Sequence, residues 1–381
     1  MKIIIAPDSF KESLTAKQVC QAMETGLKRV WPQAEYVHIP LADGGEGTVQ
    51  SLVDATQGDI IERQVTGPLG QSVDAFYGRL GGKLSHTAVI EMAAASGLHH
   101  VPPEKRDPKQ TTSYGTGELI AHALQEGATK LIIGLGGSAT NDGGMGMLEA
   151  LGVKFLDSNS HEISGNGIGL TQIESIMTHD INPKLQQCDI VIACDVDNPL
   201  CGEHGATATF GKQKGATEED TVILDNALSH FADLMDSQLG KQVKDIPGAG
   251  AAGGLGAAFL GFTNANLKPG IQIVLETLSI DQHLQDADLV ITGEGRIDWQ
   301  SAHGKTPVGI AKAAKKFDLP VIALAGCVGD NYQAVYDHGI DAVFAAIPRP
   351  FDLATAFAEA DINMANLAEN VARTIKLGMK N

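Results

Sequence analysis

Aromatic and basic residues are scarce in this chain. Only 5 % of its 381 residues are aromatic, and 28 Lys and Arg stand against 46 Asp and Glu, a formal net charge of −18. This charge argues against nucleic acid or an anionic membrane as a partner, because both attract basic proteins. Long apolar runs are missing too, and the segment 1–7 is too short for a signal peptide. We therefore expect a cytoplasmic protein that acts on a small molecule; its sequence does not distinguish a monomer from a homodimer.

The common catalytic and metal-binding signatures are also missing. The sequence contains no G-x-S-x-G, H-E-x-x-H, H-R-D or D-F-G motif, and its five cysteines are widely spaced without a C-x-x-C pair. We expect the cysteines to be small buried side chains rather than zinc ligands. Gly304-Lys305-Thr306 resembles the end of a phosphate-binding P-loop, but Trp299 stands where that motif requires its first glycine. A nucleotide would therefore have to bind without a standard P-loop.

The pattern of apolar segments predicts an α/β fold. The composition, 43 % apolar with 44 glycines, suits strands and helices joined by many tight turns. An apolar strand over 2–6 is followed by a helix that begins at the capping box Thr15–Gln18, and then by a strand over 35–40. The strands expected near the C-terminus, which alternate with helices, are 289–292, 321–325 and 342–347. This alternation predicts a parallel sheet.

The middle of the chain has a different character. Segments 60–65, 73–77 and 88–92 are separated by short glycine-containing turns, which is typical of antiparallel strands. After them we expect helices over 116–126 and 144–151, strands over 129–135 and 189–194, and loops over 246–256 and 268–270. We therefore predict one domain inserted into another, with residues 1–60 plus 285–381 forming a parallel-sheet α/β domain and residues 61–284 a mixed α/β domain.

The most informative stretch is residues 134–146, Gly-Leu-Gly-Gly-Ser-Ala-Thr-Asn-Asp-Gly-Gly-Met-Gly. A glycine-rich turn between a strand and a helix presents backbone N–H groups to an anion, and the helix dipole favours negative charge there. Ser138, Thr140 and Asn141 add short donors. Asp142 would repel a phosphate unless a cation lay between them, so the stretch suggests a magnesium-bound nucleotide. The same glycines also suit a turn that serves only tight packing.

A dehydrogenase is the alternative that this stretch leaves open. Residues 134–139 fit the G-x-G-x-x-[G/A] fingerprint of dinucleotide-binding folds, and Asp157 ends the next apolar run at about the expected distance. Asp142 separates the two hypotheses, because it suits a metal-bound nucleotide and is awkward beside a bare pyrophosphate.

Acidic residues and glycines gather after several predicted strands. The clusters are 8–12, 43–47, 195–198 and 292–298. Asp and Gly are common in turns, but ligands of open parallel sheets bind outside the carboxyl ends of the strands, where all four clusters are expected. Carboxylates there can hold Mg²⁺ or accept the proton of an attacking hydroxyl, as phosphoryl transfer requires.

Six segments together resemble the bacterial type-1 glycerate kinases. They are residues 1–15, 41–48, 89–98, 134–140, 193–200 and 291–298. The resemblance implies ATP-dependent phosphorylation of D-glycerate to 2-phosphoglycerate in glyoxylate, glucarate and galactarate breakdown, with glycerate 3-kinase regiochemistry as an alternative. It also implies a flavodoxin-like domain interrupted by an inserted second mixed α/β domain, with the active site between them.

The chemistry of the side chains assigns expected roles. Mg²⁺ prefers carboxylate oxygens, and its expected ligands are Asp43, Glu46, Asp142, Glu294 and Asp298. The residues expected to bind ATP are Gly136, Gly137, Ser138, Thr140, Asn141 and Lys305. Those expected to bind the substrate are Ser9, Glu91, Asn198, Arg296 and His303.

We expect the general base to be Asp195, which follows an apolar strand. Asp197 lies two positions on, so an extended backbone points both carboxylates to the same side, where repulsion could raise one pKa. Lys11 would meet the charge that develops during transfer. Asp8 completes the expected catalytic set and, with Glu91, is the next candidate for the base.

Overall fold

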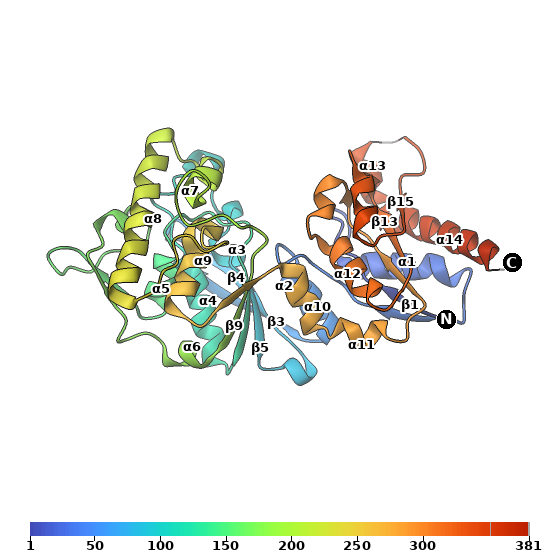
Figure 1. Ribbon diagram of the computed structural model, residues 1–381, viewed down its shortest axis with the longest axis horizontal. Coiled ribbons are helices and arrows are strands. Elements are labelled where there is room, and N and C mark those ends of the chain that lie inside the picture. Colours follow the sequence, from blue (N-terminus) through green and yellow to red (C-terminus); the bar gives the residue numbers. More distant parts are fainter. Residues whose placement is uncertain (351, 380–381) are drawn as a thin grey trace. The chain divides into compact units, whose positions relative to one another are not determined.

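The computed structural model describes residues 1–350 and 352–379 and shows an α/β protein (Figure 1). The chain forms two compact units. Unit 1 consists of Met1–Asp43, Gln50–Thr56 and Ile271–Asn381, and unit 2 of Gly44–Val49 and Gln57–Gly270. Compactness alone does not show that each unit folds separately, so the predicted domains 1–60 plus 285–381 and 61–284 stay predictions.

Unit 1 contains a parallel sheet of five strands in the described part of the chain, in the order β15-β13-β11-β1-β2. These strands are β1 (Lys2–Ile5), β2 (Glu35–His38), β11 (Leu289–Thr292), β13 (Val321–Ala325) and β15 (Ala342–Ala345). All were predicted, with ends that differ by a few residues at most. Along the chain, the sheet grows in one direction from β1 to β2 and in the other from β11 onward. The winding therefore reverses between β1 and β11.

The helices of unit 1 are α1 (Ala16–Lys28), α2 (Thr48–Thr56), α10 (Gly270–Thr277), α11 (Ile280–Leu284), α12 (Thr306–Lys315), α13 (Leu353–Ala358) and α14 (Ala360–Gly378). Of these, α2 and α10 begin in unit 2. The predicted capping box at Thr15 starts α1. Helices α1 and α14, from opposite ends of the sequence, lie side by side (Figure 1) and share one core with Ile3 and Ile5. Ile4 points to the other face, which α12 covers.

Unit 2 contains a mixed sheet, with six strands among the described residues, in the order β10-β9-β6-β5-β4-β3. The strands are β3 (Asp59–Thr66), β4 (Ser72–Arg79), β5 (Thr87–Glu91), β6 (Lys130–Gly134), β9 (Asp189–Ala193) and β10 (Asn266–Lys268). The pairings β3–β4 and β4–β5 are antiparallel, as predicted, and the pairings from β5 to β10 are parallel. The carboxyl ends of β5, β6 and β9 therefore lie at one edge.

The helices of unit 2 range from single turns to a long amphipathic helix. They are α3 (Ala93–Ser96), α4 (Tyr114–Gln125), α5 (Met145–Ala150), α6 (Pro183–Gln187), α7 (Ala206–Phe210), α8 (Glu218–Leu239) and α9 (Ala251–Phe262). A small separate hairpin pairs β7 (Lys154–Leu156) with β8 (Ser175–Met177). None of the helices in the described residues combines the length and apolarity needed to cross a membrane.

Two predicted loops are partly wrong. Within 246–256, helix α9 begins at Ala251, and its first turn is kinked because Ala252, Gly253 and Gly254 have positive φ angles. Within 268–270, Lys268 ends β10 and Gly270 begins α10. The glycines that suggested loops instead permit close packing, since a Cβ atom at Gly253 would lie 2.1 Å from the Thr140 carbonyl oxygen.

Candidate active site

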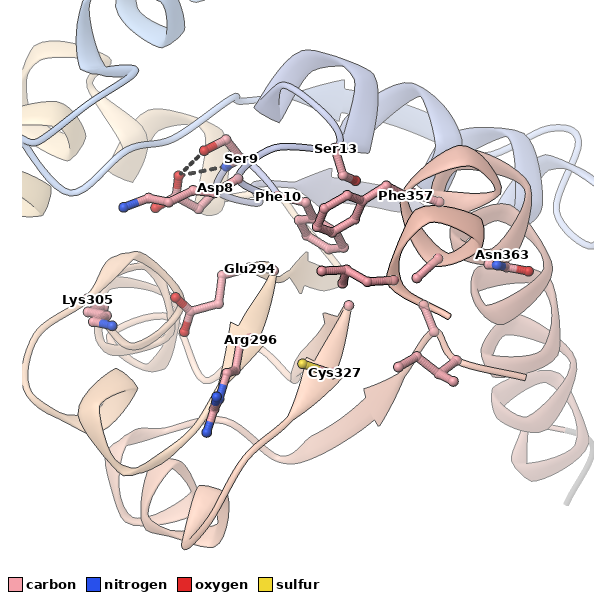
Figure 2. A pocket seen from close by; sticks show the side chains of 18 of the residues that line it. Asp8, Ser9, Phe10, Ser13, Glu294, Arg296, Lys305, Cys327, Phe357 and Asn363 are labelled. Atoms are coloured by element: carbon pink, nitrogen blue, oxygen red, sulfur yellow. Dashed lines mark hydrogen bonds between the residues drawn. The ribbon is translucent and has the colours of Figure 1, made fainter. Parts of the chain in front are cut away.

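Unit 1 has a pocket at the point where its winding reverses. Asp8 and Ser9 come shortly after β1, Glu294 and Arg296 after β11, and Gly326 directly after β13. Together with residues of α13 and α14 they line a cavity of about 390 Å³, shown in Figure 2. Seven of the predicted site residues line the pocket: Asp8, Ser9, Lys11, Asp43, Glu294, Arg296 and Lys305.

Asp8 is held in place from two sides. Its carboxylate accepts hydrogen bonds from the Ser9 backbone N–H at 2.6 Å and from the Thr306 hydroxyl, on the first residue of α12, at 2.6 Å. Burial raises the pKa of Asp8 to about 6; the Thr306 hydrogen bond opposes this rise and the nearby Asp43 adds to it. Asp8 and Asp43 are therefore two carboxylates close enough to repel each other.

Glu294 is a third carboxylate in the same pocket. The Ser301 hydroxyl donates a hydrogen bond to it. Burial raises the pKa of Glu294 to about 7, and the positive charge of Lys305 acts in the opposite direction. In Figure 2 the Glu294 carboxylate is directed toward Lys305, while Arg296 extends away from both. Oxygen ligands of this kind, gathered without a full set of cations, fit Mg²⁺ when phosphate oxygens complete its coordination.

The other end of the pocket is largely apolar, although Ser13 and Asn363 also line it (Figure 2). Phe10 lines it from the loop after β1, Leu353 and Phe357 from α13, and Ile347 from the segment after β15. Cys327 also faces this end (Figure 2). A cavity that is polar at one end and apolar at the other is suited to a ligand with a charged part and a flat or apolar part.

Two predicted site residues of unit 1 do not line the pocket. Asp298 accepts a hydrogen bond from the Gln300 N–H at 2.9 Å, which caps the 3₁₀ turn Trp299–Ala302, and it pairs with Arg296 Nε at 3.2 Å. His303 is exposed, and its Nδ1 lies 3.1 Å from the Trp299 carbonyl oxygen. Both side chains thus have partners within their own turn.

The glycine-rich stretch of unit 2 follows β6 at the edge where β5 and β9 also end. Gly136 and Gly137 are exposed, and neither of their backbone N–H groups donates to an acceptor within the described residues. The segment Gly44–Thr48 packs closely here, since a Cβ atom at Gly134 would lie 2.5 Å from the Gly44 carbonyl oxygen. Two free N–H groups at an open turn can bind an anion.

Thr140, Asn141 and Asp142 lie inside unit 2 instead. All three are fully buried. Asp142 accepts hydrogen bonds from Ser113 N–H at 2.8 Å and hydroxyl at 2.7 Å, from Gly144 N–H at 3.1 Å and from Gly146 N–H at 3.2 Å. Its carboxylate fixes the turn before α5, and this arrangement does not suit a metal ligand. We therefore leave Asp142 out of the proposed magnesium site.

The predicted general base lies at the open edge of unit 2. Asp195 and Asp197 are both exposed, and an Asp195 carboxylate oxygen accepts the Gly270 N–H at 3.0 Å. Asn198 donates to the His204 carbonyl at 2.7 Å and the Thr209 hydroxyl at 3.1 Å, so its amide stabilises its own loop. Glu46 is exposed on the segment that precedes α2.

Glu91 ends β5 and is buried. Its carboxylate accepts the Val49 N–H at 2.8 Å. Burial raises the pKa of Glu91 to about 7, although hydrogen bonds from the backbone of Val49, Gly47 and Thr48 favour the ionised form. Glu91 thus caps the start of α2, in addition to any contact with a ligand.

The arrangement around Asp157 does not match a dinucleotide-binding fold. That fold needs the acidic residue at the end of a strand beside the fingerprint strand. Here β7 pairs only with β8 among the described strands, and Asp157 accepts the N–H groups of Asn159 and His161 in its own turn, at 2.8 and 2.9 Å. Nor does any group of three or more His, Cys, Asp or Glu side chains in the described residues form a metal site by itself.

Several residues of the pocket were not predicted from the sequence. The Thr306 hydroxyl donates a hydrogen bond to Asp8, and the Ser301 hydroxyl donates one to Glu294. The apolar wall of the pocket includes Phe10, Phe357 and Cys327. Thr306 could have been predicted as a site residue, because Gly304-Lys305-Thr306 resembles the end of a P-loop. No comparable signal marks Phe357, because its position at the pocket depends on how α13 packs after β15.

The whole chain matches known proteins. The model of the glycerate kinase family covers residues 3–376. A glycerate kinase of Haemophilus influenzae is 58 % identical over 376 residues, 98 % of this chain and 99 % of that one. The glycerate 2-kinase of Escherichia coli is 54 % identical over 382 residues and the full length of both. The crystal structure of a glycerate kinase 2 from Salmonella typhimurium LT2 has a TM-score of 0.93 at 51 % identity and covers both chains fully.

The buried Glu91 predicts a pH dependence of stability. Its folded pKa, about 7, lies above its ordinary value of 4.5, so the folded state binds the extra proton between these values. The contribution of Glu91 to the free energy of unfolding is therefore largest below pH 4.5 and decreases as the pH rises to 7. Glu91→Gln keeps an acceptor oxygen but does not titrate, so its stability relative to the wild type should rise by roughly 1–3 kcal/mol from pH 4.5 to 7.

Urea unfolding at several pH values measures this difference. Glu104→Gln, at an exposed position, is the matched control and should follow the wild type throughout. If the free energies of unfolding of Glu91→Gln and the wild type differ by the same amount at every pH from 4.5 to 7, the raised pKa of Glu91 is contradicted.

Proposed function

Because this chain belongs to the glycerate kinase family and is a kinase, we propose that it transfers the γ-phosphoryl group of ATP to the 2-hydroxyl of D-glycerate. The products are 2-phosphoglycerate and ADP. The similarity to the glycerate 2-kinase of E. coli supports the 2-position. A role in glyoxylate, glucarate and galactarate breakdown is proposed from the family resemblance of the sequence alone. We expect the protein to act in the cytoplasm on this small molecule.

We further propose that unit 1 is a flavodoxin-like domain and unit 2 the inserted one. Numbered within unit 1 alone, the strands follow the order 2-1-3-4-5, which is the order of doubly wound flavodoxin-like sheets. Such sheets bind ligands outside the carboxyl ends of the strands, where the winding reverses. The pocket lies at this point.

The observation that carries the proposal is the composition of this pocket. Glycerate has seven non-hydrogen atoms, and a cavity of about 390 Å³ is larger than such a molecule needs. The apolar end formed by Phe10, Leu353 and Phe357 suits the adenine ring. The carboxylates at the other end need a cation between them and phosphates. Mg-ATP meets both requirements.

Asp43 and Glu294 are the proposed ligands of Mg²⁺. Both line the pocket, whereas Asp298 caps its own turn and Glu46 belongs to unit 2. Bound Mg²⁺ would bridge phosphate oxygens and neutralise their charge. Lys305 and Lys11 line the same pocket and would attract phosphate oxygens with their ammonium groups.

Unit 2, taken by itself, has a candidate anion site and the proposed base. The free N–H groups of Gly136 and Gly137 would donate to phosphate oxygens, and Ser138 would add its hydroxyl. Asp195 would accept the proton of the glycerate hydroxyl while the Gly270 N–H holds its carboxylate in orientation. Accepting this proton makes the oxygen a better nucleophile toward the γ-phosphorus.

The function is tested with purified protein, D-glycerate, ATP and Mg²⁺. We expect ADP release that depends on D-glycerate and stops when EDTA removes the metal. The product should be accepted directly by enolase, which requires 2-phosphoglycerate. A product that enolase accepts only after phosphoglycerate mutase is added would establish the 3-kinase instead. NADH formation from D-glycerate and NAD without ADP release would overturn the kinase.

Replacing the proposed base separates it from its neighbours. Asp195→Asn should lower kcat on the order of 10²–10⁴-fold and leave ATP binding unchanged, because the amide cannot accept the hydroxyl proton. Asp197→Asn is the matched control, since Asp197 is also exposed, and its kcat should decrease much less. If Asp195→Asn keeps more than about a tenth of kcat, short of that cost, the role passes to Asp8 or Glu91.

A further inference from the structure

A lysine is buried behind the glycine-rich turn of unit 2. Lys214 ends the 3₁₀ turn Lys212–Lys214, and only 2 % of its surface is exposed. Its ammonium group donates to the Thr140 carbonyl oxygen at 2.6 Å. Within the described residues no carboxylate lies within ion-pair distance of it; Asp142 acts on it only from further away. A buried ammonium without a paired carboxylate is costly, so an apolar side chain would serve packing better.

The atoms near this lysine have unused hydrogen-bonding capacity. The Thr140 hydroxyl and the Asn141 side-chain oxygen are buried without a partner in the described residues. The ammonium group has three donors and uses one of them on protein. The Thr140 carbonyl is also packed tightly from Gly253, where a Cβ atom would lie 2.1 Å away. Removing the ammonium would therefore leave the backbone at 140–141 without its charged partner.

The backbone at Thr140 is directly continuous with the open turn. Ala139 N–H donates to Ser96, and Gly143 N–H donates to Gly253, both at 2.9 Å. Between these two anchors, the described residues include one hydrogen bond from a charged group, which Lys214 donates to the Thr140 carbonyl oxygen. Hydrogen bonds to charged groups are stronger than neutral ones. Gly136 and Gly137 lead directly into this stretch, and the Leu98 N–H anchors the Gly137 carbonyl oxygen at 2.9 Å.

We propose that Lys214 is a positioning residue, whose internal ammonium holds residues 138–142 so that the N–H groups of Gly136 and Gly137 face an incoming phosphate. It contacts neither substrate nor nucleotide in this role. Burial lowers the pKa of Lys214 to about 7, and the negative charge of Asp142 opposes this shift. The kinetic part of the proposal rests on the proposed function; its structural part does not.

Hydrogen exchange of the unliganded protein tests the structural part. In Lys214→Met, which keeps an unbranched chain as far as Cε but lacks the ammonium group, amides in peptides covering 136–146 should exchange on the order of tenfold faster, as expected for the loss of a charged hydrogen bond. Amides of β5 and β6 should be unchanged. Lys212→Met, in the same turn but exposed, should match the wild type. Ile190→Val, a buried change in β9, the strand beside β6, reports general destabilisation.

Kinetics test the consequence for the ligand. Lys214→Met should raise the KM for ATP on the order of tenfold with kcat changed by less, because it weakens a contact made equally in the ground and transition states. The proposal is overturned if the amides of residues 136–146 exchange in Lys214→Met at the wild-type rate. It is also overturned if exchange is faster over all of unit 2, as in Ile190→Val. If the wild type shows no glycerate kinase activity, the proposed function fails, while the exchange result still decides the role of Lys214.

Discussion

The reversal of winding between β1 and β11 is the constraint on which the candidate site depends. It places the loops after two neighbouring parallel strands together, and with them Asp8 and Glu294. Burial raises the pKa of both carboxyl groups, and Asp43 adds further negative charge. An acidic pocket of this kind is stable when a cation enters it. The buried carboxylates repel one another when they are ionised, and a metal-bound nucleotide would supply the positive charge that relieves this repulsion.

Unit 2 handles charge in a different way. It buries Asp142 under four hydrogen bonds and Lys214 against one carbonyl, and leaves two N–H groups of the glycine-rich turn exposed. The buried charges give the turn a fixed shape, and the exposed N–H groups can then interact with a ligand. The glycines are needed where the backbone has a positive φ angle, as at Gly137, Gly143 and Gly144. The buried side chains thus hold the turn in place, and the exposed N–H groups remain available to a ligand.

The sequence predicted the strands of both sheets except β10, because alternation, capping and apolar runs are local signals. The capping box at Thr15 and the antiparallel pairs of β3, β4 and β5 were confirmed. It could not predict that Asp142 turns inward, that Asp298 caps a turn, or that Phe357 reaches the pocket. The orientation of Asp142 and the position of Phe357 depend on contacts between segments far apart in the chain, such as Ser113 with Asp142. The Asp298 cap is local. A carboxylate beside glycines looks the same in sequence whether it binds a metal or a backbone N–H.

The central claim is that the unit 1 pocket binds the magnesium-bound nucleotide. A crystal structure of the protein with Mg²⁺ and a non-hydrolysable ATP analogue tests it most directly. The account predicts the adenine ring against Phe10 and Phe357, and the metal on Asp43 and Glu294. A nucleotide bound elsewhere, with this pocket empty or occupied by glycerate alone, would contradict it.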